Sequence, residues 1–301
     1  MLDNRRLGWA LAAFGMLAVS TDSLFVRLSE AGAVDMAFLV SAFSLPVFLA
    51  LSRIFDTEGI SQSIKGSAAA LFGVAALSAI SQVSFITAIT RTAVANVVVI
   101  VAAAPVAAAL AARLILGERT SPRVWVAMAM TGIGIGIVVA PSVGSPSLDG
   151  DLLALLAIIA FAINLALWRR HPFLSRYVGL AIGAAIVLVV TAPFTSLDSL
   201  EPRSFAAAAA MGLLFSPAGR IAHSSAPRFA PAAEVALFAP VETVAATIWA
   251  WIAFAEPPKT ATVIGGVIIV VGVFYGTFGS ARSAGGENGR RSSRPRSIGE
   301  A

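Results

Sequence analysis

The stretch FAPVETVAATIWAWIAFAEPP, residues 238 to 258, carries a glutamate, Glu242, about halfway along an apolar run that extends from 230 to 254. A run of about 20 apolar residues can cross the roughly 30 Å hydrocarbon core of a bilayer as a helix. A charged side chain at that depth costs about 2.5 to 3.5 kcal/mol on insertion scales, so it is expected to face a helix bundle or a wet cavity. The stretch therefore predicts a membrane helix that is packed among others.

The composition extends this prediction to the whole chain. Of 301 residues, 58% are hydrophobic and 12% are charged, and the mean hydropathy is +0.87, which leaves little room for a soluble domain. The chain has no cysteine, which excludes disulfides, thiolate metal sites and a cysteine nucleophile. The net charge of +5 comes from basic residues between apolar runs and in the tail, so it indicates membrane orientation and no nucleic-acid partner.

Polar breaks divide the chain into ten apolar segments. Their residues lack the alternation of barrel strands, so the fold class is an all-α membrane protein with ten transmembrane helices. The expected spans are 7–27, 34–53, 66–88, 93–116, 122–140, 150–170, 176–194, 204–225, 230–254 and 260–279.

The basic residues predict which way these spans run. All but four of the 21 Lys and Arg residues fall on the side of the N-terminus, the exceptions being Arg27, Arg91, Arg203 and Lys259. Positive residues are retained in the cytoplasm, so both termini are expected on the cytoplasmic side. The protein itself is expected in the cytoplasmic (inner) cell membrane. The five tryptophans agree with this orientation if they anchor the two membrane interfaces, with Trp9, Trp125 and Trp168 on the inner side and Trp249 and Trp251 on the outer side.

The chain also contains an internal repeat. Residues 92–123 align without gaps on 230–261 at an offset of 138, which places Asn96 on Glu234. Residues 18–27 align on 160–169 at an offset of 142, which places Asp22 on Asn164. The expected organisation is a first five-helix repeat (1–140), a linker (141–149), a second five-helix repeat (150–279) and a disordered basic cytoplasmic tail (280–301). Because five is odd, the second repeat is inverted relative to the first.

The stretches AAAPVAAALAARLILGER and FAPVETVAATIWAWIAFAEPP, set within ten spans in two groups of five, resemble the EamA-type branch of the drug/metabolite transporter superfamily. The resemblance covers about residues 7–279. It implies a ten-helix secondary transporter that exports small metabolites, amino acids or drugs. The first half departs from the family pattern, because Ala104 stands where the second half has Glu242.

Two acids lead the candidate site residues. Glu242 either binds a proton or a cationic substrate in a central cavity or locks two helices together, since burial disfavours a charged carboxylate. Glu234 lies two turns nearer the cytoplasm, and we expect it to form a gating or structural ion pair with Arg220, as an alternative to direct substrate binding.

The other candidates are polar residues within spans, and each is either a cavity-lining residue or part of hydrogen-bonded helix packing. Asp22 lies towards the outer end of the first span, where a substrate contact competes with an interfacial ion pair. The predicted central cavity is lined by Glu242, Asp22, Asn164, Asn96, Gln82 and Ser81.

The leading function is therefore secondary transport of a small organic metabolite or amino-acid-like compound by alternating access, with protons as the candidate coupling ion. The partners are the small-molecule substrate, the lipid bilayer and protons, and the chain acts as a monomer or homodimer. No catalytic residue, metal or cofactor is expected. The alternative is an intramembrane enzyme acting on a lipid-like substrate, which would need clusters of acids or His and Asp at one membrane face; the sequence lacks them.

Overall fold

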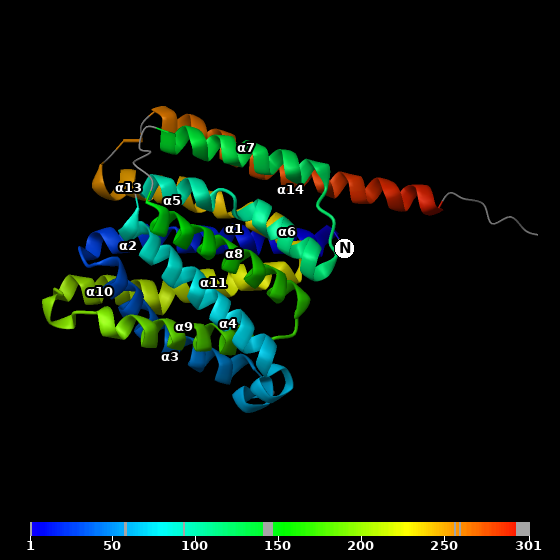
Figure 1. Ribbon diagram of the computed structural model, residues 1–301. Coiled ribbons are helices and arrows are strands. Elements are labelled where there is room, and N and C mark those ends of the chain that lie inside the picture. Colours follow the sequence, from blue (N-terminus) through cyan, green and yellow to red (C-terminus); the bar gives the residue numbers. More distant parts are fainter. Residues whose placement is uncertain are drawn as a thin grey trace, which may run out of the picture.

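The computed structural model describes residues 2–56, 59–92, 94–140, 147–255, 257–258 and 260–292, and these residues form a bundle of roughly aligned helices (Figure 1). Eight helical spans are long and apolar enough to cross a membrane, and two shorter apolar helices, Ala104–Leu116 and Pro122–Val138, bring the total to the ten that the sequence predicts. The predicted all-α fold is confirmed.

The first half contains five spans. They are formed by α1 (Leu2–Val19) with α2 (Thr21–Ser29), α3 (Ala33–Phe55), α4 (Gly59–Arg91), α5 (Val94–Val101) with α6 (Ala104–Leu116), and α7 (Pro122–Val139).

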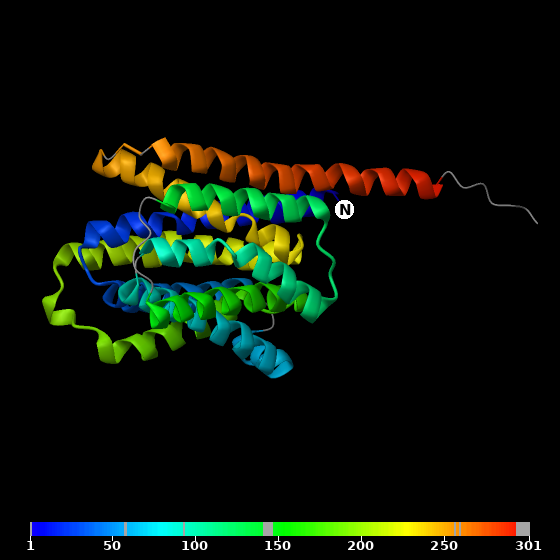
Figure 2. The same ribbon diagram turned by 45° about the horizontal axis from the view of Figure 1, so that its top comes forward.

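The second half repeats this plan. Its spans are α8 (Leu148–Arg170), α9 (Arg176–Thr191) with two short turns (Ala192–Phe194 and Leu197–Ser199), α10 (Pro202–Ala210) with the π-helix η4 (Met211–Phe215), α11 (Ser216–Ser225) and the short η5 (Ala226–Arg228), α12 (Ala232–Ala236) with α13 (Ala239–Phe254), and α14 (Thr260–Ser292). The first residues of α1 and the far end of α14 lie at the same end of the bundle (Figure 2).

The C-terminal tail differs from the prediction. Residues 280–292, expected to be disordered, continue α14 as helix up to Ser292, while 293–301 lie outside the described residues. Extending an existing helix adds one hydrogen bond for each residue fixed and avoids a new nucleus, which explains how a polar segment prolongs a membrane helix. The predicted linker, 141–149, lies mostly outside the described residues, and α8 already begins at Leu148.

Two symmetric helix crossings relate the halves. In one, α1 meets α11 where Gly15 and Gly219 touch, since a Cβ on Gly15 would lie 3.0 Å from the Gly219 carbonyl oxygen. In the other, α8 meets α4 where Ser81 donates a hydrogen bond of 3.0 Å to the Ala157 carbonyl. The repeat offset of 142 relates Gly15 to Ala157, and the offset of 138 relates Ser81 to Gly219. Exchange of the two halves therefore maps one crossing onto the other.

The fourth and ninth spans are both broken in mid-course. A turn separates α5 from α6 and another separates α12 from α13, and each following helix starts with the sequence Ala-Pro-Val. Proline has no N–H and fixes φ, so it suits the first turn of a new helix and not the interior of a continuous one. The breaks align Pro105 with Pro240, whereas the ungapped alignment places Thr243 on Pro105. Glu242 therefore corresponds to Ala107 and not to Ala104.

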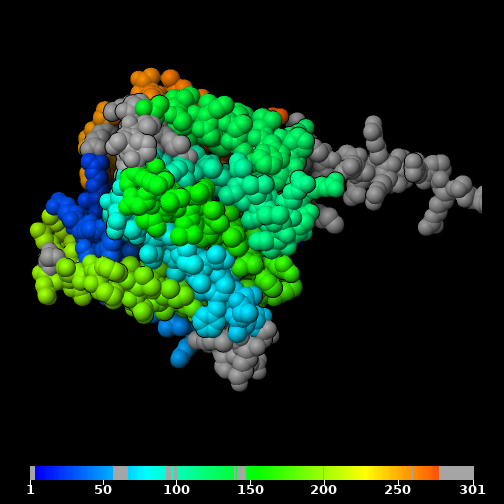
Figure 3. Space-filling view, in the orientation of Figure 1, coloured from blue at the N-terminus to red at the C-terminus, as the bar shows by residue number. Residues whose placement is uncertain are grey.

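The outer surface is apolar, as a lipid-facing surface should be. On the face shown in Figure 3, α8 lies at the surface, and its exposed side chains include Leu152, Leu156 and Ile159.

Not all of the tryptophans predicted to anchor the protein at the membrane interfaces lie at the outer surface. Trp9 and Trp168 are only 5% and 3% exposed, so their rings pack inside the protein and cannot anchor it to the interface as the sequence suggested.

Candidate functional site

Arg220 lies at the centre of the helix bundle. It is eight residues before the end of the span Pro202–Arg228, a depth of about 12 Å at 1.5 Å per residue. Its Nη1 donates a hydrogen bond of 2.8 Å to Gln82 Oε1 on α4, and its Nε donates one of 3.0 Å to Ser216 Oγ. Gln82 and Arg220 are 138 residues apart, which is the offset of the repeat. The bond therefore joins equivalent positions of the two halves.

Two acids lie within electrostatic range of this guanidinium. Asp22 on α2 and Glu242 on α13 both act on Arg220, and Glu242 also acts on Asp22. We refer to Asp22, Gln82, Arg220 and Glu242 as the central cluster. It draws two residues from each half of the chain, so any relative movement of the halves changes its geometry.

Both acids occupy the first turn of a helix that starts within a span. Ser20 separates α1 from α2, which places Asp22 in the first turn of α2, and the break before Ala239 places Glu242 in the first turn of α13. The unpaired N–H groups at a helix start carry a partial positive charge, which stabilises a nearby carboxylate. The break before α13 thus adds a partial positive charge beside Glu242, whereas at the start of α2 the Ser20 N–H is already bonded to the Met16 carbonyl at 2.8 Å.

Several buried polar atoms beside the cluster have no hydrogen-bond partner among the residues that the structure describes. They include Asp22 Oδ1 and both ring nitrogens of His223, which stacks on Phe161 with ring centroids 5.5 Å apart. Buried polar groups are nearly always paired with protein, water or ligand. These atoms indicate that the cluster accepts a polar ligand or ordered water.

The local fold explains why Arg220 can reach this position. The π-helix Met211–Phe215 widens the span by one residue per turn just before α11, and Pro217 follows in the first turn of α11. Such π-bulges redirect side chains and often occur at functional sites. Within this π-helix, Gly212 allows α3 to approach closely, because a Cβ at Gly212 would lie 2.8 Å from the Val40 carbonyl oxygen.

Glu234 has a different partner from the one predicted. The structure pairs it with Arg5, whose Nε donates a hydrogen bond of 2.9 Å to Oε2 and whose Nη2 forms an ion pair with Oε1. Trp9 Nε1 also donates to Oε2, at 2.9 Å. The predicted pair with Arg220 does not form, because Arg220 lies with the central cluster. Glu234 is only 3% exposed and ties the start of α1 to α12.

Three predicted cavity residues bond to helix neighbours in the structure. Ser81 donates to the Ala157 carbonyl, and Asn164 Nδ2 donates to the Val74 carbonyl at 2.6 Å, so both join α4 to α8. Asn96 Nδ2 donates to Thr92 Oγ1 at 3.3 Å. The structure thus places these residues outside the central cluster, in contacts typical of helix packing.

Comparison with known proteins identifies the family. A model described as the EamA-like transporter family matches residues 6–140 and 148–277, which covers both halves. The chain belongs to the EamA-like transporter family. It is therefore a multi-pass membrane protein and a transporter. No curated protein matches this EamA-like chain.

A solved structure shares the fold. It is described only as the crystal structure of a protein, is 17% identical in sequence, and superposes with a TM-score of 0.77 over 91% of this EamA-like chain and 98% of its own. At this identity the likeness supports the fold alone.

The main feature that the sequence analysis of this EamA-like transporter missed is the bond between Gln82 and Arg220. Extending the repeat offset of 138 to the third and eighth spans would have paired the two positions. The role of Arg5 left no such signal, since a basic residue near the N-terminus is explained by the positive-inside rule alone. Among the described residues there is no group of three or more His, Asp or Glu residues that could hold a metal ion.

Proposed function

We propose that this EamA-like chain is a secondary transporter that exports a small organic metabolite, of amino-acid-like chemistry, with the central cluster as its binding site. The observation that carries the proposal is a partly buried guanidinium, Arg220, that interacts electrostatically with two carboxylates from different helices and is bonded to Gln82. Such charges are costly inside a membrane protein and are typical of substrate and ion pathways.

The charges of the cluster suit a zwitterion. The Arg220 guanidinium can form a bidentate pair with the carboxylate of the substrate. Asp22 or Glu242 can accept hydrogen bonds from the ammonium group of the substrate. The unpartnered Oδ1 of Asp22 leaves such an acceptor free. Two acids against one base also leave one carboxyl able to carry a proton when no substrate ammonium is bound, which supports protons as the coupling ion.

The arrangement of the halves supports alternating access. Inverted repeats can exchange conformations, so that the site opens first to one side of the membrane and then to the other. The positive-inside pattern supports a cytoplasmic membrane location with both termini inside. The cluster is contained in one chain, so a monomer suffices for transport, and a homodimer would contain two sites.

The Arg5–Glu234 pair supports a gate near the cytoplasmic end. It is nearly buried and links α1 to α12, so opening the inner side between these helices requires it to separate. Ser81, Asn164 and Asn96 act in this proposal through helix packing around the central cluster, and Gln82 orients Arg220 within the cluster.

The test is a flux assay in proteoliposomes. A panel of amino acids and other small zwitterions is screened for uptake driven by a pH gradient, with Glu242→Gln assayed in parallel. We expect at least a tenfold loss of flux in this variant, the effect of losing about 1.4 kcal/mol of stabilisation, and loss of the response to the gradient.

The matched control is Glu30→Gln, because Glu30 is an exposed acid paired with Arg203 at the outer end of the bundle. It should transport as the wild type does. Equal flux in Glu242→Gln and Glu30→Gln would contradict the assignment of the central cluster.

A further inference from the structure

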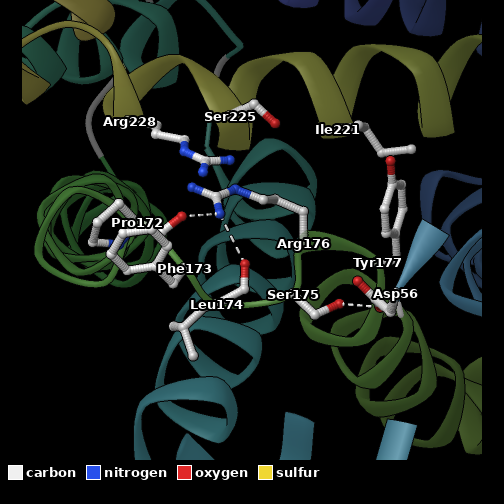
Figure 4. Close-up of a pocket in the computed structure, with 10 residues that line it drawn as sticks. All are labelled: Asp56, Pro172, Phe173, Leu174, Ser175, Arg176, Tyr177, Ile221, Ser225 and Arg228. Atoms are coloured by element: carbon white, nitrogen blue, oxygen red, sulfur yellow. Dashed lines mark hydrogen bonds between the residues drawn. The ribbon is translucent and has the colours of Figure 1, made fainter. Parts of the chain in front are cut away.

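A second polar site lies away from the central cluster, at the end of the bundle where α3 and α11 end and α9 begins (Figure 4). It is an open pocket of about 260 Å³, lined by Asp56, Pro172, Phe173, Leu174, Ser175, Arg176, Tyr177, Ile221, Ser225 and Arg228. We call it the arginine pocket. By the alternation of spans, it faces the same side of the membrane as the N-terminus.

The arginine pocket has an unbalanced positive charge. Arg176 and Arg228 lie side by side, close enough for their guanidinium charges to repel each other. Neither forms an ion pair with any residue that the structure describes. The one acid in the lining, Asp56, accepts a hydrogen bond of 2.5 Å from Ser175 Oγ. Two like charges held side by side repel each other, and a bound counter-charge would relieve this repulsion.

Arg176 is also incompletely bonded. Its guanidinium stacks over the Trp168 ring, with Cζ 5.3 Å from the ring centroid, and only 8% of the residue is exposed. Its Nη1 donates to the carbonyls of Pro172 and Leu174, at 2.5 and 2.8 Å. Its Nε and Nη2 are buried and have no hydrogen-bond partner in the described part of the chain. A buried guanidinium with two unused donors requires an acceptor.

The surrounding backbone favours a negative acceptor. Arg176 is the first residue of α9, a helix of 16 residues, and Ser175 caps its start. The positive end of the helix dipole therefore lies at the arginine pocket. Ser225 and Tyr177 add hydroxyl groups to the lining.

We propose that the arginine pocket binds a phosphate-type anion, held between Arg176 and Arg228 at the start of α9. Arginine forks match the geometry of phosphate oxygens and form short charge-assisted bonds with them. The anion can come from a soluble phosphate or from the headgroup of an anionic phospholipid. Phe173 is 89% exposed, and its ring centroid lies 5.8 Å from Arg228 Cζ. In the second case, this ring is well placed to contact the lipid interface. This site is independent of the proposed transport function.

The experiment measures thermal unfolding of the full chain in nanodiscs. One arm uses phosphatidylcholine discs and adds inorganic phosphate against chloride at constant ionic strength, and the other replaces part of the phosphatidylcholine by phosphatidylglycerol. The wild-type unfolding temperature should rise saturably in at least one arm. A rise with phosphate identifies a soluble anion, and a rise with phosphatidylglycerol alone identifies the headgroup.

The decisive variant is Arg228→Glu. Arg228 is exposed, and its side chain makes no hydrogen bond within the part of the chain that the structure describes; its backbone carbonyl accepts one, from Arg169 Nη1 at 3.4 Å. Its replacement should therefore leave the fold intact. A carboxylate at this position supplies Arg176 with an internal counter-charge. The variant should therefore unfold at a higher temperature than the wild type without added anion, and it should lose the response to phosphate and phosphatidylglycerol.

The matched control is Arg53→Glu, which reverses the charge of another exposed arginine in the last turn of α3, at the same end of the bundle. It should keep the wild-type response. In a direct titration with phosphate or a short-chain phosphatidylglycerol, Arg228→Gln should bind at least about tenfold more weakly than the wild type. Equal anion responses in wild type and Arg228→Glu, or no response in either arm, would overturn the proposal.

Discussion

At the scale of single residues, burial decides which charged pairs matter. Glu234 is 3% exposed and is bonded by Arg5 and Trp9, whereas Glu30 and its partner Arg203 are open to solvent. Removing one member of a buried ion pair leaves a buried uncompensated charge, but an exposed pair contributes little because water and salt screen it.

We therefore expect Glu234→Ala to lower the free energy of unfolding by about 3 to 5 kcal/mol, and Glu30→Ala to lower it by less than about 1 kcal/mol. The measurement is equilibrium unfolding in mixed micelles with increasing sodium dodecyl sulfate. The double variant Arg5→Ala/Glu234→Ala should recover part of the loss, because neither charge is then unpaired. Similar losses in the two single variants would show that the Arg5–Glu234 pair is as weakly coupled as a surface pair.

Residue types could be predicted from the sequence, but their partners could not. The cost of a charge in hydrocarbon singles out Asp22, Arg220 and Glu242 wherever they occur in apolar runs. The choice between Arg5 and Arg220 as the partner of Glu234 depends on which helices are neighbours and on where Arg220 is drawn by Gln82. That information is tertiary and has no local signature.

At the scale of helices, glycines set how closely two spans approach. Helices α7 and α14 touch at Gly134, where an added Cβ would lie 2.7 Å from the Gly265 carbonyl oxygen. Two residues away in sequence, Gly132 faces open space, with nothing within 4 Å of an added Cβ. Of these two glycines, Gly134 is the one that permits the close contact between the helices.

Gly134→Ala should destabilise the protein by about 1 to 3 kcal/mol, because the clash is with rigid backbone and the helices must separate. Gly132→Ala should be neutral or stabilising by up to about 1 kcal/mol, because alanine is the better helix former. The same detergent unfolding assay compares the two. An equal effect of the two substitutions would mean that the α7–α14 contact does not contribute to stability.

Most helix boundaries were predictable to within a few residues, the C-terminal end of α14 being an exception, and helix breaks were not. The Ala-Pro-Val sequences at 104–106 and 239–241 both begin helices inside a span, yet Pro46 lies within α3 without ending it. A proline inside a membrane helix is tolerated when neighbouring helices satisfy the freed backbone groups. Whether it breaks the helix therefore depends on packing around it.

At the scale of the whole molecule, the even number of spans places both ends of the chain on one side. The absence of cysteine makes this testable, since an introduced cysteine is the only thiol. Ser196→Cys lies beyond α9, at the end proposed to be outside, and Arg119→Cys lies between α6 and α7, at the end proposed to be inside. Both positions are exposed.

An impermeant maleimide should label Ser196→Cys in intact cells and Arg119→Cys only after the membrane is opened. The expected result follows from the distribution of Lys and Arg. Labelling of Arg119→Cys in intact cells, with Ser196→Cys protected, would reverse the orientation proposed for this transporter and would place the arginine pocket on the outer side.

The way α1 packs on α11, and α8 on α4, has a consequence for biosynthesis. The first span leaves the ribosome long before α11, the helix that packs against Gly15. Until α11 is inserted, lipid or a chaperone must cover the surface around Gly15. Neither half can complete its own interior, and assembly is postponed until the eighth span has been inserted. Two separately encoded halves should therefore mature only when they are produced in the same cell.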